Sequence, residues 1–413
     1  MKSTQDLRRG NRLRVLLLLR EHDSLSRVDL AAATGLTEAA VSRITRELVE
    51  AGLVTEGPGA AAAGGRAGRP SVGLSLRPGG VHALGFDLGA NSHAVCLVDA
   101  KGQVLARRAL RIPQPGRARE TLALAVQAGR ALLESSGVDP CRVVGVGVAI
   151  AGHVDRANRR LVESEPLQWR DVGVVDYLEE GLRLPATVET RPGALLFAER
   201  LHGAAQDMQN VLLVHAALGL GGAMLLDGRR VRGRSNTAGQ LAHMPVPGSG
   251  LVCPCGRHGC LTLLASGRSI VARLPGGRKP ATAAAEVKAL QARLEAANRG
   301  DPAAAGALRE AGVHMGRALD CLVPVLDVQR VVLAGMVGSQ SDYLAGVKSQ
   351  WTHPQVDVVA SGMPSDLAAA ALALERFFYS TDFDFERLGR DMPQARVPAP
   401  DAPPAGRRLA ANL

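Results

Sequence analysis

Long apolar runs are missing from the N-terminal part of this 413-residue chain. The run from Val15 to Leu19 ends at Arg20, far short of the roughly 20 residues that cross a bilayer or the ~7–15 of a signal-peptide core. Aromatic residues are also scarce, at 3%, and carry no functional signal. We therefore expect a cytoplasmic protein that has no membrane partner.

Cysteines are few and unevenly placed. Six are present, and three of them, Cys253, Cys255 and Cys260, fall within eight positions. Because thiols stay reduced in the cytosol, such clustering favours a metal site over a set of disulfides. The other cysteines are scattered along the chain.

Chain length and charge give the first positive indications. A chain of this length predicts two or three domains, and 46% apolar residues suffice to fold them. The formal charge is +10, which suits a polyanionic partner such as DNA. Residues 1–78 carry 12 Lys and Arg against 8 Asp and Glu, so the positive charge is densest there.

Residues 8–56 have the pattern of three short helices. Gly35 stands where two of them could turn sharply, and Thr37 is a plausible N-cap for the next. Helix, glycine turn and helix are typical of a helix-turn-helix. A glycine-rich stretch, 57–70, precedes a short alternating segment and is typical of the wing of a winged helix, although it also suits a linker.

The remainder predicts an α/β architecture. Residues 81–111 suggest three consecutive strands with a turn at Lys101-Gly102, and 121–137 an amphipathic helix. Glycine-rich segments follow buried strands repeatedly, which suggests two similar halves. We expect a winged helix-turn-helix DNA-binding domain at 1–78, a domain of two α/β lobes at 79–390, and a disordered, proline-rich tail at 391–413.

The cysteine cluster has the spacing of a structural metal site. Gly256 and Gly259 allow one tight loop to bring the three thiols together, and a closed tetrahedral zinc site needs one more ligand. His243 is the preferred candidate and His258 the rival. Four protein ligands leave no position for water, so the zinc would order a loop. The predicted zinc ligands are His243, Cys253, Cys255 and Cys260.

Several motifs together resemble the ROK family of sugar kinases and sugar-responsive repressors. His243 followed by CxCGxxGC resembles that family's signature, and 238–246 and 260–262 are similar to its AGEIGHM and GCLE segments. The resemblance covers most of 81–380 and implies an actin-like ATPase fold. The N-terminal winged helix is characteristic of the repressor branch, which implies operator DNA as a partner.

The resemblance also locates the position of the kinase base. Family kinases carry Asn-Asp in a segment similar to 188–199, where this chain has Thr190 and Arg191. A guanidinium has no acceptor and cannot remove a hydroxyl proton. Glu189 is displaced by one residue and should point elsewhere. We therefore predict that this protein is not an enzyme.

Other family positions differ in the same direction. Gln240 and Thr262 stand where the family carries sugar-binding carboxylates, and Pro166 replaces a sugar-contacting Asn. Leu218 replaces a phosphate-contacting Thr, and Ala90-Asn91 departs from the family's first phosphate loop. The phosphate-loop remnants are Asp87, Gly89, Gly219, Gly221 and Gly222.

These losses bear on the effector. Each lost hydrogen bond to a sugar hydroxyl should weaken hexose binding by roughly 0.5–3 kcal/mol. Either the ligand differs from the common family sugars, for example as an anion paired with Arg191, or the domain responds to a partner protein. The candidate effector-binding residues are Arg191, Gln240, His243 and Thr262.

The helix-turn-helix supplies the DNA-reading candidates, because the start of its second helix enters the major groove. Arg43 or Arg46 could read guanine. Val41, Ile44 and Leu48 are assigned to the core. The predicted DNA-binding residues are Thr37, Glu38, Ala39, Ser42, Arg43 and Arg46, with Arg66 and Arg69 in the wing.

The sequence thus predicts a winged-helix transcriptional regulator, a repressor of carbohydrate-related genes with a structural Zn²⁺ and no kinase activity. Paired half-sites in operators favour a homodimer or tetramer. Two alternatives remain: a sugar kinase fused to a DNA-binding module, and a regulator controlled by a protein partner in place of a sugar.

Overall fold

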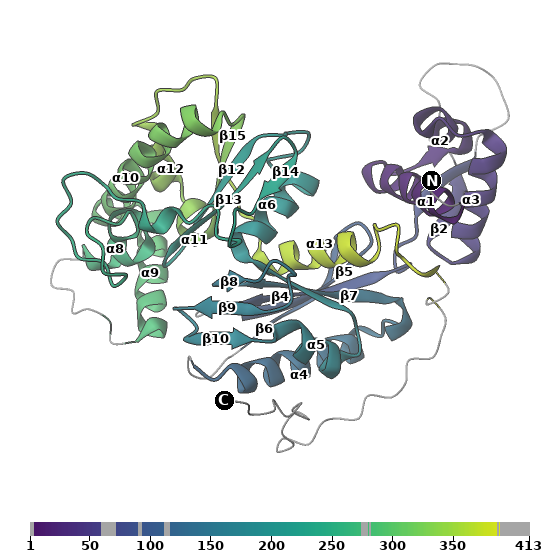
Figure 1. Ribbon diagram of the computed structural model, residues 1–413, viewed down its shortest axis with the longest axis horizontal. Helices are drawn as coiled ribbons and strands as arrows, with labels where there is room; N and C mark the ends of the chain where they lie inside the picture. Colours follow the sequence, from purple (N-terminus) through teal and green to yellow (C-terminus); the bar gives the residue numbers. More distant parts are fainter. Residues whose placement is uncertain are drawn as a thin grey trace, which may run out of the picture.

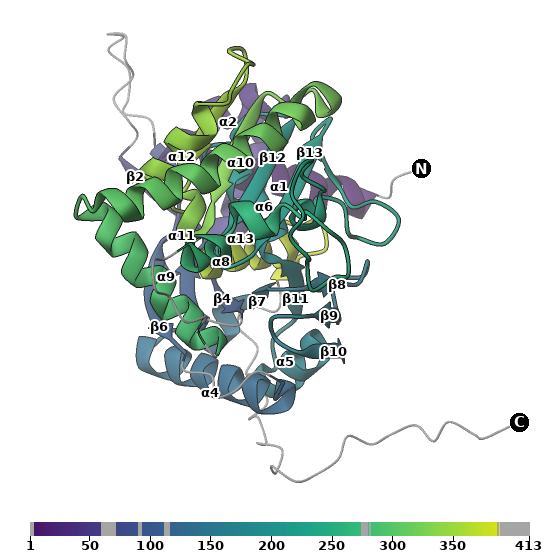
Figure 2. The same cartoon turned by 90° about the vertical axis from the view of Figure 1, so that its left-hand side faces the viewer.

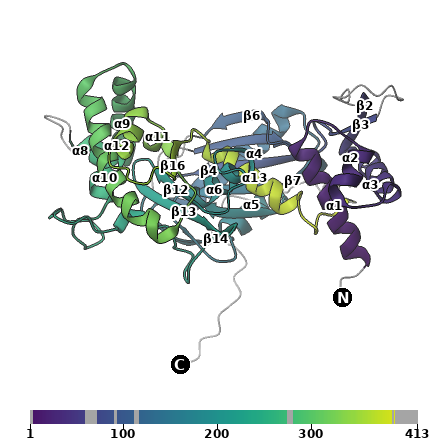
Figure 3. The ribbon, with the colours of Figure 1, turned by 90° about the horizontal axis from the view of Figure 1, so that it is seen from above.

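The computed structural model describes residues 4–58, 72–89, 93–110, 116–273, 280, 282–385 and 388. These residues form a winged helix-turn-helix followed by two α/β lobes, as predicted (Figure 1). Seen from above, the N-terminal domain lies at one end of an elongated molecule and the second lobe at the other (Figure 3). No described helix combines the length and apolar character that a bilayer crossing requires.

The N-terminal domain has three helices and a small sheet in the order β1-β3-β2. A capping box between Ser26 and Asp29 starts the second helix, and Gly35 ends it at φ 69°, which glycine adopts without strain. Thr37 accepts a hydrogen bond from the Ala40 N–H at 3.2 Å and so starts the third. The predicted glycine turn and N-cap are confirmed. The elements are α1 (Thr4–Glu21), β1 (Leu25–Ser26), α2 (Arg27–Thr34), α3 (Glu38–Glu50), β2 (Val54–Pro58) and β3 (Val72–Leu76).

The first lobe has a five-stranded sheet in the order β11-β7-β4-β5-β6. The strands β4, β7 and β11 run parallel, whereas β4, β5 and β6 form the predicted antiparallel meander with Gly102 in a turn. Helices α4 and α5 cover one face of the sheet (Figure 2). Its elements are β4 (His82–Leu88), β5 (His93–Asp99), β6 (Val104–Ala109), α4 (Ala118–Ser136), β7 (Val143–Ile150), α5 (Val174–Leu182) and β11 (Ala186–Thr190), with a small sheet of β8 (His153–Val154), β9 (Leu161–Ser164) and β10 (Trp169–Val172).

The second lobe repeats this plan with the strand order β14-β13-β12-β15-β16. Long helices form a core against one face of the sheet, and helical residues from 194–198 and 368–371 form a second cluster with the other face. Its elements are α6 (Arg191–His202), β12 (Val211–Ala216), β13 (Leu220–Leu226), β14 (Arg229–Val231), α7 (Thr262–Ala265), α8 (Gly267–Ala272), α9 (Ala283–Asn298), α10 (Pro302–Leu326), β15 (Arg330–Ala334), α11 (Gly335–Gly338), α12 (Ser341–Lys348) and β16 (Asp357–Ala360).

One further helix, α13 (Ser365–Phe377), lies between the two sheets. It packs on β4 and β7 of the first lobe and on α6 of the second. A Cβ at Gly147 would lie 1.8 Å from the Ala369 carbonyl oxygen, and one at Gly85 would lie 2.0 Å from that of Asp366. Glycine in the strands and alanine in the helix therefore permit the close approach.

The winged helix shares a hydrophobic core with the first lobe. Leu16 and Leu19 of α1 join a buried cluster that includes Phe378 and Tyr379, directly after α13. Arg20 forms an ion pair with Glu375 at 2.9 Å and lies over the Tyr379 ring. The winged helix is thus packed against the segment that directly follows the helix between the lobes.

Two predicted segments lie outside the described residues. They are the wing, with Arg66 and Arg69, and the tail at 391–413. The predicted boundary after residue 78 falls between the end of β3 at Leu76 and the start of β4 at His82.

Candidate functional site

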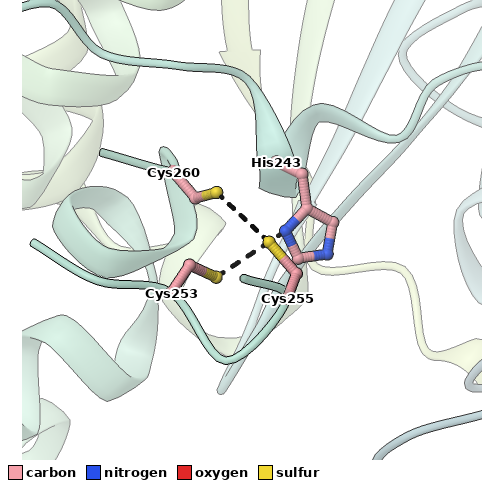
Figure 4. Close-up of side chains that lie close together, drawn as sticks. All are labelled: His243, Cys253, Cys255 and Cys260. Atoms are coloured by element: carbon pink, nitrogen blue, oxygen red, sulfur yellow. Dashed lines mark hydrogen bonds between the residues drawn. The ribbon is translucent and has the colours of Figure 1, made fainter. Parts of the chain in front are cut away.

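The cysteine cluster forms one compact group of ligand atoms. The ring nitrogen of His243 and the sulfurs of Cys253, Cys255 and Cys260 all lie within 4.8 Å of one another (Figure 4). The sulfurs of Cys255 and Cys260 are 3.6 Å apart, and that of Cys253 lies 3.8 Å from His243 Nδ1. His258, the rival ligand, is exposed and is not part of this group.

These distances fit a tetrahedral zinc ion. Two sulfurs that each lie about 2.3 Å from zinc are roughly 3.8 Å apart at a tetrahedral angle. Three thiolates and one imidazole are also a donor set that zinc prefers. With all four positions taken by protein atoms, the metal can hold the loop but has no place for a reacting water.

The loop is built by short backbone contacts. Gly256 and Gly259 have φ values of 84° and 65°, which turn the chain around the thiols. The Cys253 N–H donates to the Arg257 carbonyl at 2.8 Å, and an N–H of Arg257 lowers the pKa of the Cys255 thiol. The three cysteines therefore lie on one folded hairpin, and binding a metal would require little rearrangement of it.

Arg191 occupies the region where the sequence placed a phosphate loop. Its Nε lies 2.6 Å from the Asp87 carboxylate in an ion pair whose side chains are almost buried. A Cβ at Gly89 would lie 2.0 Å from the Arg191 guanidinium, so this side chain packs directly on the loop backbone. Asp87, one of the predicted phosphate-loop remnants, is thus paired with Arg191.

The second phosphate-loop remnant approaches the same place. A Cβ at Gly221 would lie 3.0 Å from the ring of Pro192, next to Arg191 at the start of α6. A Cβ at Gly222 would lie 2.9 Å from the Gly239 carbonyl, beside Gln240. For Gly219 nothing described lies within 4 Å of such a Cβ. The predicted loops are therefore brought together around the N-terminus of α6.

Two histidines are affected by the positive charge of Arg191. Burial and the positive charge of Arg191 lower the pKa of His93 to about 4 and that of His215 to about 3. His93 Nδ1 accepts a hydrogen bond from the Gly89 N–H at 3.2 Å. Both imidazoles are therefore neutral in the folded protein at pH 7, and they add no positive charge to the site.

Acid should destabilise the protein through these two histidines. In the unfolded chain each binds a proton below its ordinary pKa of 6.5, whereas in the folded chain each stays neutral down to about pH 4 or below. The contribution of each neutral histidine to the free energy of unfolding is therefore complete above about pH 6.5. It is lost as the pH falls from 6.5 toward the pKa of that histidine in the folded chain. At pH 5 we expect a loss of about 2 kcal/mol for each histidine.

Urea unfolding of the wild type and of His93→Asn at pH 7 and pH 5 measures this effect. The variant should lose about 2 kcal/mol less than the wild type between the two pH values. Loss of metal in acid affects both proteins alike and cancels in the comparison. His22→Gln, at an exposed position, is the matched control and should show the pH dependence of the wild type. The same pH dependence in His93→Asn would show that His93 does not contribute to the loss of stability in acid.

A second charged group, around Glu189, was not predicted from the sequence. The Glu189 carboxylate is 3% exposed and is bound by Arg230, while the Arg232 guanidinium lies 3.5 Å away. Asn158 donates to Glu189 at 3.0 Å and accepts from Arg232 at 2.7 Å. The Glu189 carboxylate is thus held by these three side chains. The arginine-rich stretch 229–234 was the one sequence signal for this group.

The remaining effector candidates lie next to the metal loop. Gln240 is exposed and directly precedes the 3-10 turn that carries His243. Thr262 is the first residue of α7, and its carbonyl accepts a hydrogen bond from the Ser266 hydroxyl at 2.6 Å. The Leu261 N–H donates to the Met244 carbonyl at 2.8 Å, which holds the two segments together.

Helix α3 presents the predicted DNA-reading face. Val41, Ile44 and Leu48 are buried, as expected, and anchor the helix in the domain core. Arg43 and Arg46 are exposed. At the start of the helix, Thr37, Glu38 and Ala39 are exposed and Ser42 is half-buried.

Comparison with known proteins gives consistent matches to this arrangement. The ROK family profile matches residues 83–371, and the profile for winged helix-turn-helix DNA-binding domains matches residues 8–55. The N-acetylglucosamine repressor of Shigella flexneri is 28% identical over 79% of this chain and 80% of its own length. The xylose repressor of Bacillus spizizenii is 24% identical over 87% of this chain and 92% of its own.

A solved structure matches the whole arrangement as well. It is that of a ROK family transcriptional regulator described as a homologue of the Escherichia coli MLC protein. The TM-score is 0.72 at 25% identity, with 91% of this chain and 97% of that chain covered. The similarity thus extends over the winged helix and both lobes.

Proposed function

The chain belongs to the ROK family, and from that premise we propose that it is a DNA-binding transcriptional repressor of carbohydrate-related genes. The observation that carries the proposal is the exposed face of α3, whose Arg43 and Arg46 project from a winged helix. Its relatives include repressors named for N-acetylglucosamine and xylose. A regulator of this kind acts on chromosomal DNA in the cytoplasm.

The effector domain does not act as a kinase in this proposal. The position of the base is held by Arg191, which is paired with Asp87. A protonated guanidinium can neither accept the hydroxyl proton nor leave Asp87 free for a metal ion. Incubation with ATP, Mg²⁺ and a panel of hexoses should yield no ADP above a protein-free blank, and turnover would contradict this part of the proposal.

Zinc has an architectural role. The four ligands close the coordination sphere, so the ion would fix the hairpin that carries Cys253 to Cys260 beside Gln240 and Thr262. Those two positions and Arg191 are the proposed effector-binding residues, together with His243. A ligand that contacts them would act on the segment that the metal holds in place.

The assembly is proposed to be a homodimer or tetramer. Operators with two half-sites require two recognition helices at a fixed spacing. Size-exclusion chromatography with light scattering, with and without operator DNA, measures the state directly.

Replacing Arg43 with alanine should weaken operator binding by about 1–3 kcal/mol, because a bidentate contact to guanine is lost. The operator is first selected from a random duplex library on the immobilised wild-type protein. Fluorescence anisotropy then gives the affinities of the variants for the selected site.

Arg299→Ala is the matched control. It removes the same charge from the far lobe, where Arg299 is 71% exposed, and should leave operator affinity unchanged. Equal affinity of the wild type and Arg43→Ala would exclude this arginine from base reading. Failure of the library to yield any enriched sequence would overturn the proposed function.

A further inference from the structure

The arginines around Glu189 carry more positive charge than the acids around them balance. Arg230 and Arg232 converge on the single Glu189 carboxylate. Arg156 donates to the Arg234 carbonyl at 3.4 Å, two residues beyond Arg232. Burial and, after it, the charge of Arg156 lower the pKa of Arg232, and burial and the charge of Arg232 lower the pKa of Arg230 to about 10. An additional anion would stabilise the charged form of guanidinium groups whose pKa values are lowered by burial and by a neighbouring positive charge.

Hydrogen-bonding capacity is also left over in this group. Arg230 Nε and Asn236 Oδ1 are both buried and have no hydrogen-bond partner among the described residues. The Asn236 amide group donates to the Val154 and Asp155 carbonyls at 2.8 and 3.3 Å, which fixes the orientation of its oxygen. Buried polar atoms without partners are rare in folded proteins, so Arg230 Nε, and Asn236 Oδ1 next to the Asp155-Arg156 backbone, each have a hydrogen bond left to form with a ligand.

The group is reachable and lies where the two lobes meet. The side chains of Arg230 and Arg232 are 21% and 33% exposed. Glu189 ends strand β11 of the first lobe, whereas Arg230 lies in β14 of the second. A ligand that binds these arginines would therefore replace contacts between the lobes.

We propose that Arg156, Arg230 and Arg232 form the anion-binding part of the effector site. The ligand class is a hydroxylated small molecule that carries a carboxylate or a phosphate. The guanidinium groups bind the oxyanion, and Asn236 Oδ1 accepts from a hydroxyl. Glu189 keeps its bonds from the Thr190 N–H and from Asn158 when the arginines turn to the ligand. This inference rests on the proposed function, since it identifies what the regulator senses.

The test measures binding to the full-length protein without DNA. Isothermal titration at constant ionic strength uses inorganic phosphate, glucose 6-phosphate, gluconate and uncharged glucose. We expect phosphate and at least one of the two anionic sugar derivatives to bind, and glucose to bind at least about tenfold more weakly. A preference for glucose 6-phosphate identifies a phosphate ligand, and a preference for gluconate identifies a carboxylate.

Variants separate this site from general electrostatics. Arg230→Gln and Arg232→Gln should weaken phosphate binding by about tenfold or more. Arg229→Gln is the matched control, because it removes the same charge from the exposed neighbour on β14, whose side chain points to the opposite face. Arg232→Lys keeps the charge but not the planar fork and should restore binding only in part.

A gain of affinity distinguishes a ligand site from a structural clamp. Glu189→Gln removes the internal competitor and should strengthen phosphate binding, whereas a cluster that only joins the lobes would gain nothing. The proposal is overturned if no anion binds, if Arg229→Gln and Arg230→Gln lose equally, or if Glu189→Gln binds no better than the wild type. Operator binding is assayed separately, so failure of the repressor proposal is recognised by loss of DNA binding with anion binding intact.

Discussion

Cys260→Ser is expected to release the metal and to lower the free energy of unfolding by more than about 4 kcal/mol, which is the range for lost metal sites. The serine hydroxyl is a poor zinc ligand, and Cys260 is 1% exposed at the start of the segment that leads into α7. Without the metal, the hairpin from Cys253 to Cys260 loses the contact that closes it. Leu261, fully buried in the second-lobe core, directly follows Cys260, so the disorder should spread into that core.

Metal content by mass spectrometry and unfolding by calorimetry measure these effects together. Cys321→Ser is the matched control, because Cys321 is an exposed free thiol away from the cluster. It should keep one zinc per chain and an unchanged melting temperature. A Cys260→Ser protein that retained its zinc and its stability would show that the four residues do not form the site.

Glu189→Gln should destabilise the protein by about 3–5 kcal/mol, the cost of leaving a buried charge without its partner. Arg230 and Arg232 would then face each other across a half-buried space with no carboxylate between them. The amide of glutamine also presents hydrogens to both guanidinium groups. The first lobe and the second lobe would separate more easily as a result.

Urea unfolding without added anions gives the size of the effect. Glu163→Gln is the matched control, since Glu163 forms an ion pair with Arg170 in which both side chains are more than half exposed. Such surface pairs contribute about 0–1 kcal/mol. A loss in Glu189→Gln no larger than that of the control would show that the arginines find other partners. Inorganic phosphate should restore part of the lost stability if the arginines bind anions.

Much of the fold follows from local patterns. The helix-turn-helix depends on one glycine turn and on the Thr37 N-cap, which act within a few residues. Alternating strands with a turn at Gly102 gave the meander of the first lobe. The metal site could be predicted equally well, because three of its ligands share one loop and neighbouring backbone hydrogen bonds join His243 to that loop.

Contacts between distant residues could not be derived in this way. The sequence indicates that Arg191 cannot act as a base, but its pairing with Asp87 joins residues 104 positions apart. Glu189 and Arg230 come from different lobes, so their contact depends on how two sheets are placed around α13. Side-chain direction in β11 decides which group each residue joins, and a shift of one residue would reverse it.

The core that α1 shares with the end of α13 bears on how such regulators can be recombined. A chimera that exchanged residues 1–78 alone would separate Leu16 and Leu19 from Phe378 and Tyr379. Apolar side chains on both parts would then lose their native packing partners. The winged helix therefore cannot be exchanged alone, and the segment directly after α13 that carries Phe378 and Tyr379 has to be exchanged with it. We therefore expect sequence changes that alter DNA specificity to fall on the exposed face of α3, because changes to the face toward the lobe require a matching change in Phe378 or Tyr379.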